Sequence, residues 1–159
     1  MTDNGALTEL RSRVARLETG DRATNYSKAG ITPDGGLFVY LTAGEALTRG
    51  EVVYCPQAPA GASGKVWKNP VNGSMPVGVA YANADADASV KVVVSGIAYV
   101  LPEAGFTASR GYVIYSSDAT AGRVDQSATV TASTQREIGH WVEDGSGNGA
   151  AARALLHFN

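Results

Sequence analysis

Residues 47–54 read Leu-Thr-Arg-Gly-Glu-Val-Val-Tyr, and residues 106–115 read Phe-Thr-Ala-Ser-Arg-Gly-Tyr-Val-Ile-Tyr. Each stretch begins with an apolar residue, passes through a polar turn that ends in glycine, and continues as a β-branched strand that ends in tyrosine. Three further segments recur in the same order, 58 to about 63 residues apart: Gly64–Val66 with Gly122–Val124, Val77–Ala80 with Ile138–Trp141, and Ser89–Val94 with Ala152–Phe158. An internal repeat of this length predicts two similar β units around one core.

Short strands separated by glycine-containing turns are typical of a small β-barrel or sandwich. We therefore expect residues 43–159 to form an all-β domain built from two pseudo-repeated units. The most continuous apolar run is Val92–Val94 with Ile97 and Val100. Because a strand covered on both faces lacks polar alternation, this run is expected to be a central strand.

Other parts of the domain are expected at its periphery. Val66 and Trp67 have a lysine on either side, a pattern that indicates the edge of a sheet. The loops 56–64 and 144–151 are rich in glycine or proline and are expected to be exposed turns. Loops held by a rigid scaffold are places where partners bind.

Composition limits the classes of function. The chain has 159 residues, 44% of them hydrophobic and 18% charged, enough for one modest domain and an arm. Its net charge of -2, from 13 Lys and Arg against 15 Asp and Glu, argues against a nucleic-acid partner, since a phosphate backbone is bound by clustered positive charge. No apolar run approaches the roughly 18 residues of a membrane span, and no secretory signal pattern is present. We expect a soluble protein with no membrane partner.

The first twenty residues carry a heptad pattern. Apolar side chains recur at spacings of three, four and three residues, as at the a and d positions of a coiled coil. The order Arg, apolar, two free positions, apolar, Glu over residues 13–18 resembles short three-stranded coiled coils. We therefore predict a trimeric coiled-coil helix over residues 1–20. Its interface is formed by Leu7, Leu10, Val14 and Leu17, with Arg13 and Glu18 paired between chains. Two heptads are short, so an amphipathic helix that lies on its own domain stays open as the alternative.

Residues 21–42 lack a helical period and contain several turn-forming residues, so they are expected to form an extended arm or linker. The arm ends in Leu37–Leu41, a short apolar strand after a Pro-Asp-Gly turn. Such a strand can pair with the body or with a neighbouring subunit. We expect Leu37, Phe38 and Tyr40 to contact a partner or another copy of the chain.

Residue types that carry catalysis are sparse. His140 and His157 are the two histidines, and both lie in expected strands without a local partner, as satisfied or surface histidines do. Cys55 is a lone thiol, expected to be a half-buried small residue. Residues 83–87 resemble the start of a calcium loop but lack the glycine and the glutamate that such a loop needs. We predict no catalytic residue, cofactor, metal site or small-molecule substrate, and hence no enzyme.

The segments Ala43–Val53, Pro76–Ala80, Val92–Ala98 and Gly111–Tyr115 together resemble the small β-barrel cement or decoration proteins of tailed-bacteriophage heads. The resemblance spans residues 43–158, and the helical N-terminus is more similar to the head-fibre type. It implies a homotrimer, made in the cytoplasm of the bacterial host, that binds the major capsid protein on the outer capsid surface at threefold or quasi-threefold positions. The arm residues then become candidate capsid contacts.

The expected function is therefore that of a virion structural protein that stabilises the head. A trimer multiplies modest contacts through effective concentration, and binding to the assembled lattice alone opposes its disruption. The alternative is a trimeric receptor- or glycan-binding module of a tail fibre or spike, which would stack Tyr and Trp faces on sugars. A non-viral trimeric scaffold is a third hypothesis.

Overall fold

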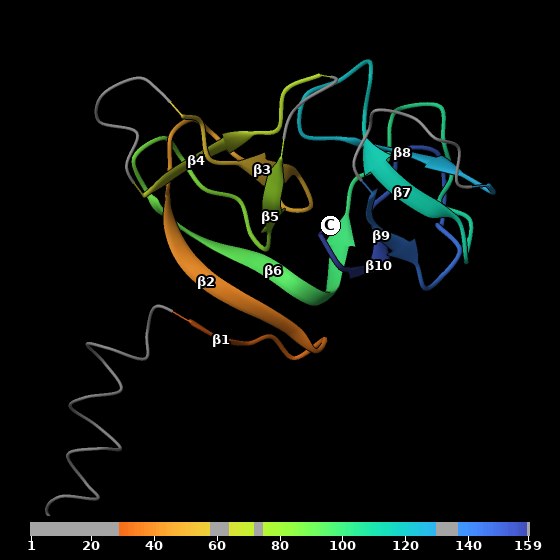
Figure 1. The fold of residues 1–159 in the computed structure, drawn as a ribbon, viewed down its shortest axis with the longest axis horizontal. Helices are drawn as coiled ribbons and strands as arrows, with labels where there is room; N and C mark the ends of the chain where they lie inside the picture. The colour runs from red at the N-terminus through yellow and green to blue at the C-terminus, as the bar shows by residue number, and fades with distance from the viewer. Residues whose placement is uncertain (1–28, 58–63, 72–74, 130–136, 159) are drawn as a thin grey trace, which may run out of the picture.

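The computed structural model describes residues 29–57, 64–71, 75–129 and 137–158, and within them it contains strands and turns but no helix (Figure 1). The expected all-β class is confirmed for these residues. The predicted coiled-coil helix over residues 1–20 and the first part of the arm lie outside the described residues. The strands are β1 (Ala29–Ile31), β2 (Gly36–Ala43), β3 (Val52–Tyr54), β4 (Lys65–Lys68), β5 (Pro76–Ala80), β6 (Ser89–Val100), β7 (Val113–Ser116), β8 (Val124–Ser127), β9 (Glu137–Trp141) and β10 (Ala152–Leu156).

In the part of the chain that the structure describes, no helix has the length and apolar character needed to cross a membrane.

Five strands close into a small barrel. Their hydrogen-bonded order is β2, β4, β3, β5 and β6, and β6 pairs back onto β2. β2 and β4 are parallel, whereas the other neighbours in the ring are antiparallel. Figure 1 shows the long strands β2 and β6 running side by side, with β3, β4 and β5 on one side of them. The interior is filled by small and branched apolar residues, namely Ala43, Leu47, Val53, Val66, Ala80, Val90 and Val92.

The second unit repeats this pairing order. β6 is 12 residues long, and its C-terminal half pairs with β10, which is followed by β9, β7 and β8. A parallel bridge between Pro102 and Val124 links β8 to the residues that follow β6. This bridge is the equivalent, in the second unit, of the parallel β2–β4 pair in the first. Thus β7, β8, β9 and β10 correspond to β3, β4, β5 and the first half of β6. The repeat predicted from the sequence is present in three dimensions, and β6 is shared by both units.

Equivalent hydrogen bonds recur 61 residues apart. Main-chain N–H groups donate from Gly50 to Ala80 at 2.8 Å and from Gly111 to Trp141 at 2.9 Å. Gly50 and Gly111 have φ values of 90° and 83°, a backbone region that favours glycine. Each glycine ends the turn before the first strand of its unit. This conformation is the physical reason why glycine stands at this point of both repeats.

A second glycine pair marks close contact between neighbouring strands. Gly78 in β5 and Gly139 in β9 occupy equivalent positions of the repeat. A Cβ on Gly78 would lie 2.6 Å from the carbonyl oxygen of Val93, and a Cβ on Gly139 would overlap the carbonyl oxygen of Leu155. Both oxygens belong to the backbone of the adjacent strand, so a side chain here requires the strands to move apart.

The larger core joins the two units. Successive side chains along β3, β5 and β6 point to opposite faces of the strand. Val52, Val79 and Val93 therefore point away from the barrel interior and into this second core. There they pack with residues of the second unit, the largest of which are Trp141, Ile114, Ile138 and Leu156. The two units therefore share one continuous body, held by apolar burial at their junction.

One expectation about a single strand is corrected. The segment around Val66 and Trp67 is not a sheet edge, because β4 lies between β2 and β3 in the closed ring. The apolar strand expected at the end of the arm, Leu37–Leu41, lies within β2 and pairs with the body, which is one of the two pairings expected for it. The expectation for Val92–Val100 is confirmed, since β6 pairs with β2, β5 and β10.

Candidate interaction surface

The arm residues singled out by the sequence lie on β2, at the side of the first barrel. β1 pairs with β2 in a register that places Ile31 opposite Leu37 and Gly30 opposite Phe38. Ile31 and Leu37 are 75% and 46% exposed, so they form an apolar pair on the surface. The Phe38 ring lies over Gly30, where a Cβ would be 2.8 Å from the ring. Phe38 thereby covers the glycine of the short strand, a known way to stabilise glycine in a sheet.

Phe38 and Tyr40 stand on the same face of β2 and contact each other edge to face, with ring centroids 5.5 Å apart. Lys91 is directly opposite Tyr40 on β6. Its ammonium group lies 4.3 Å from the centre of the Phe38 ring and 5.7 Å from that of Tyr40. The Tyr81 ring is 5.0 Å from the same ammonium. One cation thus contacts three aromatic rings within the distance at which cation–π attraction operates, about 6 Å.

A second cation continues this surface toward the other unit. The guanidinium carbon of Arg49 lies 4.6 Å from the centre of the Tyr99 ring and 5.9 Å from that of Tyr81. Tyr99 is opposite Arg153 of β10. The surface therefore crosses from the first barrel to the second unit. We call it the aromatic patch, and it consists of Phe38, Tyr40, Arg49, Tyr81, Lys91 and Tyr99.

An ion pair lies next to the aromatic patch. Arg153 donates from its main-chain N–H and from its Nε to Glu143, at 2.9 and 2.8 Å. These hydrogen bonds hold the pKa of the Glu143 carboxyl below its usual range, and the carboxylate in turn raises the pKa of Arg153. Both side chains are partly exposed, so the pair orients charge at the surface and contributes little to stability.

The aromatic patch has the chemistry of a protein contact surface. Tyrosine and arginine are enriched where proteins bind one another, because they offer large, stiff contact areas with a polar end. Here the rings also position the two cations. Groups arranged for bond making, a nucleophile beside a base, are not part of the patch. The arrangement is suited to binding.

The second unit contains two buried carboxylates with opposite pKa shifts. Burial raises the pKa of Glu103, but hydrogen bonds from the hydroxyl groups of Ser117 and Thr120, at 2.5 and 3.1 Å, outweigh it, so the pKa is lowered. Burial raises the pKa of Asp125, and the negative charge of Asp118 raises it further. Glu103 thus holds the loop between β7 and β8 in place, whereas Asp125 is a charge that the fold accommodates at a cost.

The sequence found only part of this surface. It identified Leu37, Phe38 and Tyr40, but the proposed trimer residues Leu7, Leu10, Arg13, Val14, Leu17 and Glu18 lie outside the described residues. Arg49, Tyr81, Lys91 and Tyr99 were missed. Lys91 left one signal, since it is the charged residue within an otherwise apolar run over residues 90–94.

Cys55 is exposed rather than half-buried, and desolvation still raises its pKa.

The chain is thus a module of two β units with the aromatic patch on its surface. Comparison with known families identifies it further. Residues 39–156 match the family described as phage cement protein. The match covers both β units and more than half of the chain, and the chain belongs to this family. Phage cement proteins are structural components of the virion on the outer surface of the capsid, so the location in the virion that the sequence predicted is confirmed.

A similar fold is found among solved structures. The head fibre gp8.5 N base of bacteriophage phi29 resembles this chain with a TM-score of 0.55 and 15% sequence identity, over 76% of this chain and 92% of that one. At this identity the likeness concerns the fold alone. A comparison with curated proteins finds no match.

Proposed function

We propose that this chain is a trimeric capsid decoration protein that binds the major capsid protein at threefold or quasi-threefold sites and stabilises the head. The observation that carries the proposal is the family match, which extends over both β units. The phi29 neighbour is by its title a head fibre, which agrees with a role at the head. No catalytic step is required, because the stabilisation comes from binding.

The N-terminal heptad pattern supports the trimer. In the proposed assembly Leu7, Leu10, Val14 and Leu17 form the core of a parallel coiled coil. β1 supports an additional contact between chains, since within the described residues it pairs only with β2 and so keeps one free edge. The exposed Ile31 belongs to β1, and the exposed Leu37 is its neighbour on β2. We assign Leu37 to a contact between chains.

The aromatic patch supports the capsid contact. We assign Phe38 and Tyr40 to this contact, together with the cations Lys91 and Arg49. A trimer carries three such patches, and binding by one raises the effective concentration of the other two at the capsid surface. A modest affinity for each patch is therefore sufficient. Because the trimer binds the assembled lattice and not its dissociated subunits, it stabilises the lattice by mass action.

Binding to heads stripped of accessory proteins tests this function. Tyr40→Ala removes an exposed ring from the patch, and Tyr112→Ala is a matched control, because the two tyrosines are 40% and 37% exposed and Tyr112 lies outside the patch. Truncating a central aromatic residue of an interface costs about 2 kcal/mol or more, so we expect cosedimentation to need at least roughly 30-fold more Tyr40→Ala protein. The control should bind like the wild type. Equal binding of both variants would place the contact elsewhere.

Antibody labelling of intact particles tests the class of function separately. Label over the head agrees with decoration. Label confined to the tail tip would contradict decoration and favour the receptor- or glycan-binding module. The native mass of the purified protein tests the trimer. This mass should be about 49 kDa, three times the 16.4 kDa of one chain.

A further inference from the structure

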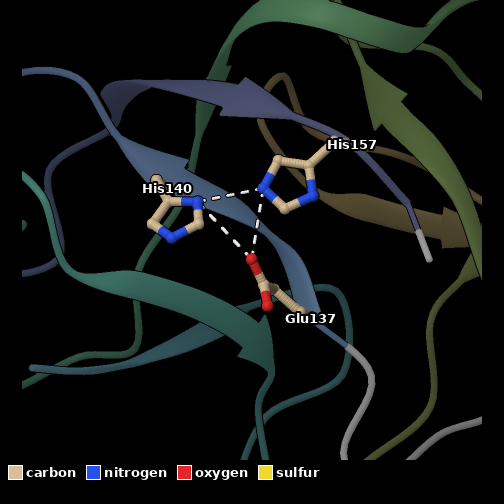
Figure 2. A group of neighbouring side chains, drawn as sticks. All are labelled: Glu137, His140 and His157. Atoms are coloured by element: carbon tan, nitrogen blue, oxygen red, sulfur yellow. Dashed lines mark hydrogen bonds and ion pairs between the residues drawn. The ribbon is translucent and has the colours of Figure 1, made fainter. Parts of the chain in front are cut away.

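The second unit brings together three side chains that are typical metal ligands. Glu137 is the first residue of β9 and His140 the residue before its last, and His157 follows the last residue of β10 (Figure 2). The Nδ1 atom of His140 is 2.9 Å from Nε2 of His157. Oε1 of Glu137 lies 3.5 Å from Nδ1 of His140 and 3.2 Å from Nε2 of His157. Figure 2 shows that the three atoms face one another across the strands.

Local backbone geometry explains why these residues converge. Residues three apart on a regular strand point to opposite faces. In the pairing of β7 with β9, however, Ile114 is opposite Gly139 and the next residue, Tyr115, is opposite Glu137, so Ile138 is an extra residue. This β-bulge turns Glu137 toward the face that carries His140. His157 reaches the same face from β10, where its main-chain N–H donates to Ile138 at 2.9 Å.

The fold itself does not require these residues. β5 has a register shift at the equivalent position, and there Pro76 and Val79 stand where Glu137 and His140 stand in β9. The same backbone is therefore built with an apolar residue and a proline. The ligand-type side chains are a feature of the second unit alone.

The distances suit a small tetrahedral cation. Zn²⁺ binds histidine nitrogen at about 2.0–2.1 Å and carboxylate oxygen at about 2.0–2.2 Å, so two ligand atoms of a tetrahedral site are roughly 3.3 Å apart. The three distances here, 2.9, 3.2 and 3.5 Å, lie around that value. All three side chains are partly exposed, which leaves room for water as a further ligand.

Hydrogen bonding alone does not account for the triangle. A ring nitrogen has one site in the plane of the ring, occupied either by a hydrogen or by a lone pair. If both facing nitrogens carry hydrogen, two N–H groups oppose each other at 2.9 Å. If only one of the two nitrogens carries hydrogen, the lone pair of the other nitrogen faces the carboxylate oxygen of Glu137, and these two acceptors repel each other. With the Glu137 carboxylate ionised, no placement of hydrogen on the two rings makes all three contacts favourable, whereas a cation at the centre accepts three lone pairs at once.

We propose that Glu137, His140 and His157 bind a divalent transition-metal ion, with Zn²⁺ the ion that best suits two imidazoles and one carboxylate. The bound ion would link β9 to the chain end that follows β10, beyond the last paired residues, Gly139 and Leu156. It would thereby fasten the C-terminal strand of the second unit.

Titration of the full chain with Co²⁺ and then Zn²⁺ tests the site. The protein is used without a histidine tag and with Cys55→Ser, so that the exposed thiol cannot bind the metal. Co²⁺ gives intense visible absorption in four- or five-coordinate sites and weak absorption in six-coordinate ones. We expect one Co²⁺ per chain with intense bands, displaced by an equimolar amount of Zn²⁺, and a higher thermal midpoint with Zn²⁺.

Matched variants locate the ligands. Glu137→Gln keeps the shape of the side chain but removes the carboxylate, and Glu143→Gln is the control on the neighbouring surface. We expect Glu137→Gln and His157→Gln to weaken Co²⁺ binding by about 10–100-fold or more, since substitution of residues that only hydrogen-bond to metal ligands already has an effect of this size. Glu143→Gln should bind as the parent does. Absence of a one-to-one Co²⁺ complex, or equal binding by Glu137→Gln and Glu143→Gln, would overturn the proposal. Circular dichroism of each variant distinguishes a lost ligand from a lost fold.

Discussion

We expect Gly139→Ala to destabilise the protein strongly, although it adds a single methyl group. The new Cβ would overlap the carbonyl oxygen of Leu155 on β10. That oxygen belongs to the backbone, so the clash cannot be relieved by a side-chain rotation. Forcing an extra carbon into a packed site costs about 1–3 kcal/mol, and loosening one hydrogen bond of the ladder adds about 1 kcal/mol. The expected loss is therefore about 2–4 kcal/mol.

Thermal unfolding followed by circular dichroism measures this loss. In a domain of this size 1 kcal/mol corresponds to about 2–4 °C, so Tm should fall by roughly 4–16 °C. EDTA in the buffer removes any contribution from metal bound by the adjacent His140. Gly78→Ala should behave similarly, because Gly78 faces the carbonyl oxygen of Val93 in the equivalent place of the first unit.

Gly147→Ala is the matched control. A Cβ at Gly147 meets nothing within 4 Å, and its φ is not positive. Alanine there restricts the unfolded chain and should stabilise the protein by about 0.4–1 kcal/mol, so the two substitutions are expected to shift Tm in opposite directions. If Gly139→Ala and Gly147→Ala unfold at the same temperature, the close approach of β9 and β10 is not what selects glycine at position 139.

Three further outcomes follow from buried charge and from the heptad. Glu103→Gln should lower the free energy of unfolding by about 1–3 kcal/mol at pH 7. Because the folded pKa of Glu103 is lowered, the wild type keeps this advantage above the unfolded pKa of the carboxyl and loses it as the pH falls through the folded pKa. Urea unfolding between pH 7 and pH 3 measures this loss. Asp125→Asn should raise Tm at pH 7, since the folded pKa of Asp125 is raised above its unfolded value. As the pH falls through the folded pKa, protonation removes the unfavourable charge from the wild type as well, so the difference in Tm should shrink. A difference that does not shrink would contradict this cause. Val14→Asp combined with Leu17→Asp should reduce the native mass from about 49 kDa to that of one chain; an unchanged mass in native mass spectrometry would mean that the heptad does not hold the trimer.

The repeat was readable in the sequence because its signals are local. Glycine at 50 and 111 follows from a left-handed turn, and the β-branched residues after it follow from strand geometry. Each signal needs only a few neighbouring residues, so sequence spacing was sufficient to match the units. The prediction of a sheet edge at Val66 and Trp67 was wrong because an edge is not a local property. Whether a strand has one neighbour or two depends on closure of the ring, which joins β4 to β2 across 21 residues of chain.

The aromatic patch was only partly predictable. Phe38 and Tyr40 alternate on one strand, and that period is visible in the sequence. Their partners come from other segments: Lys91 is brought opposite Tyr40 by the register of β2 with β6, and Arg49 meets Tyr99 at the junction of the two units. A register slip of one residue would move Lys91 to the other face of the sheet, so the charge of Lys91 within an apolar run does not reveal which rings it contacts.

The sequence by itself determined the all-β class, the two-unit repeat and the family, because glycine turns and strand periods are encoded over short stretches. Tertiary structure alone decided which side chains meet. His140 and His157 are separated by 17 residues, and Glu137 joins them only because a bulge at Ile138 reverses the face to which it points. Strand register and bulges depend on contacts distant in sequence, and these contacts build both the aromatic patch and the cluster of Glu137, His140 and His157.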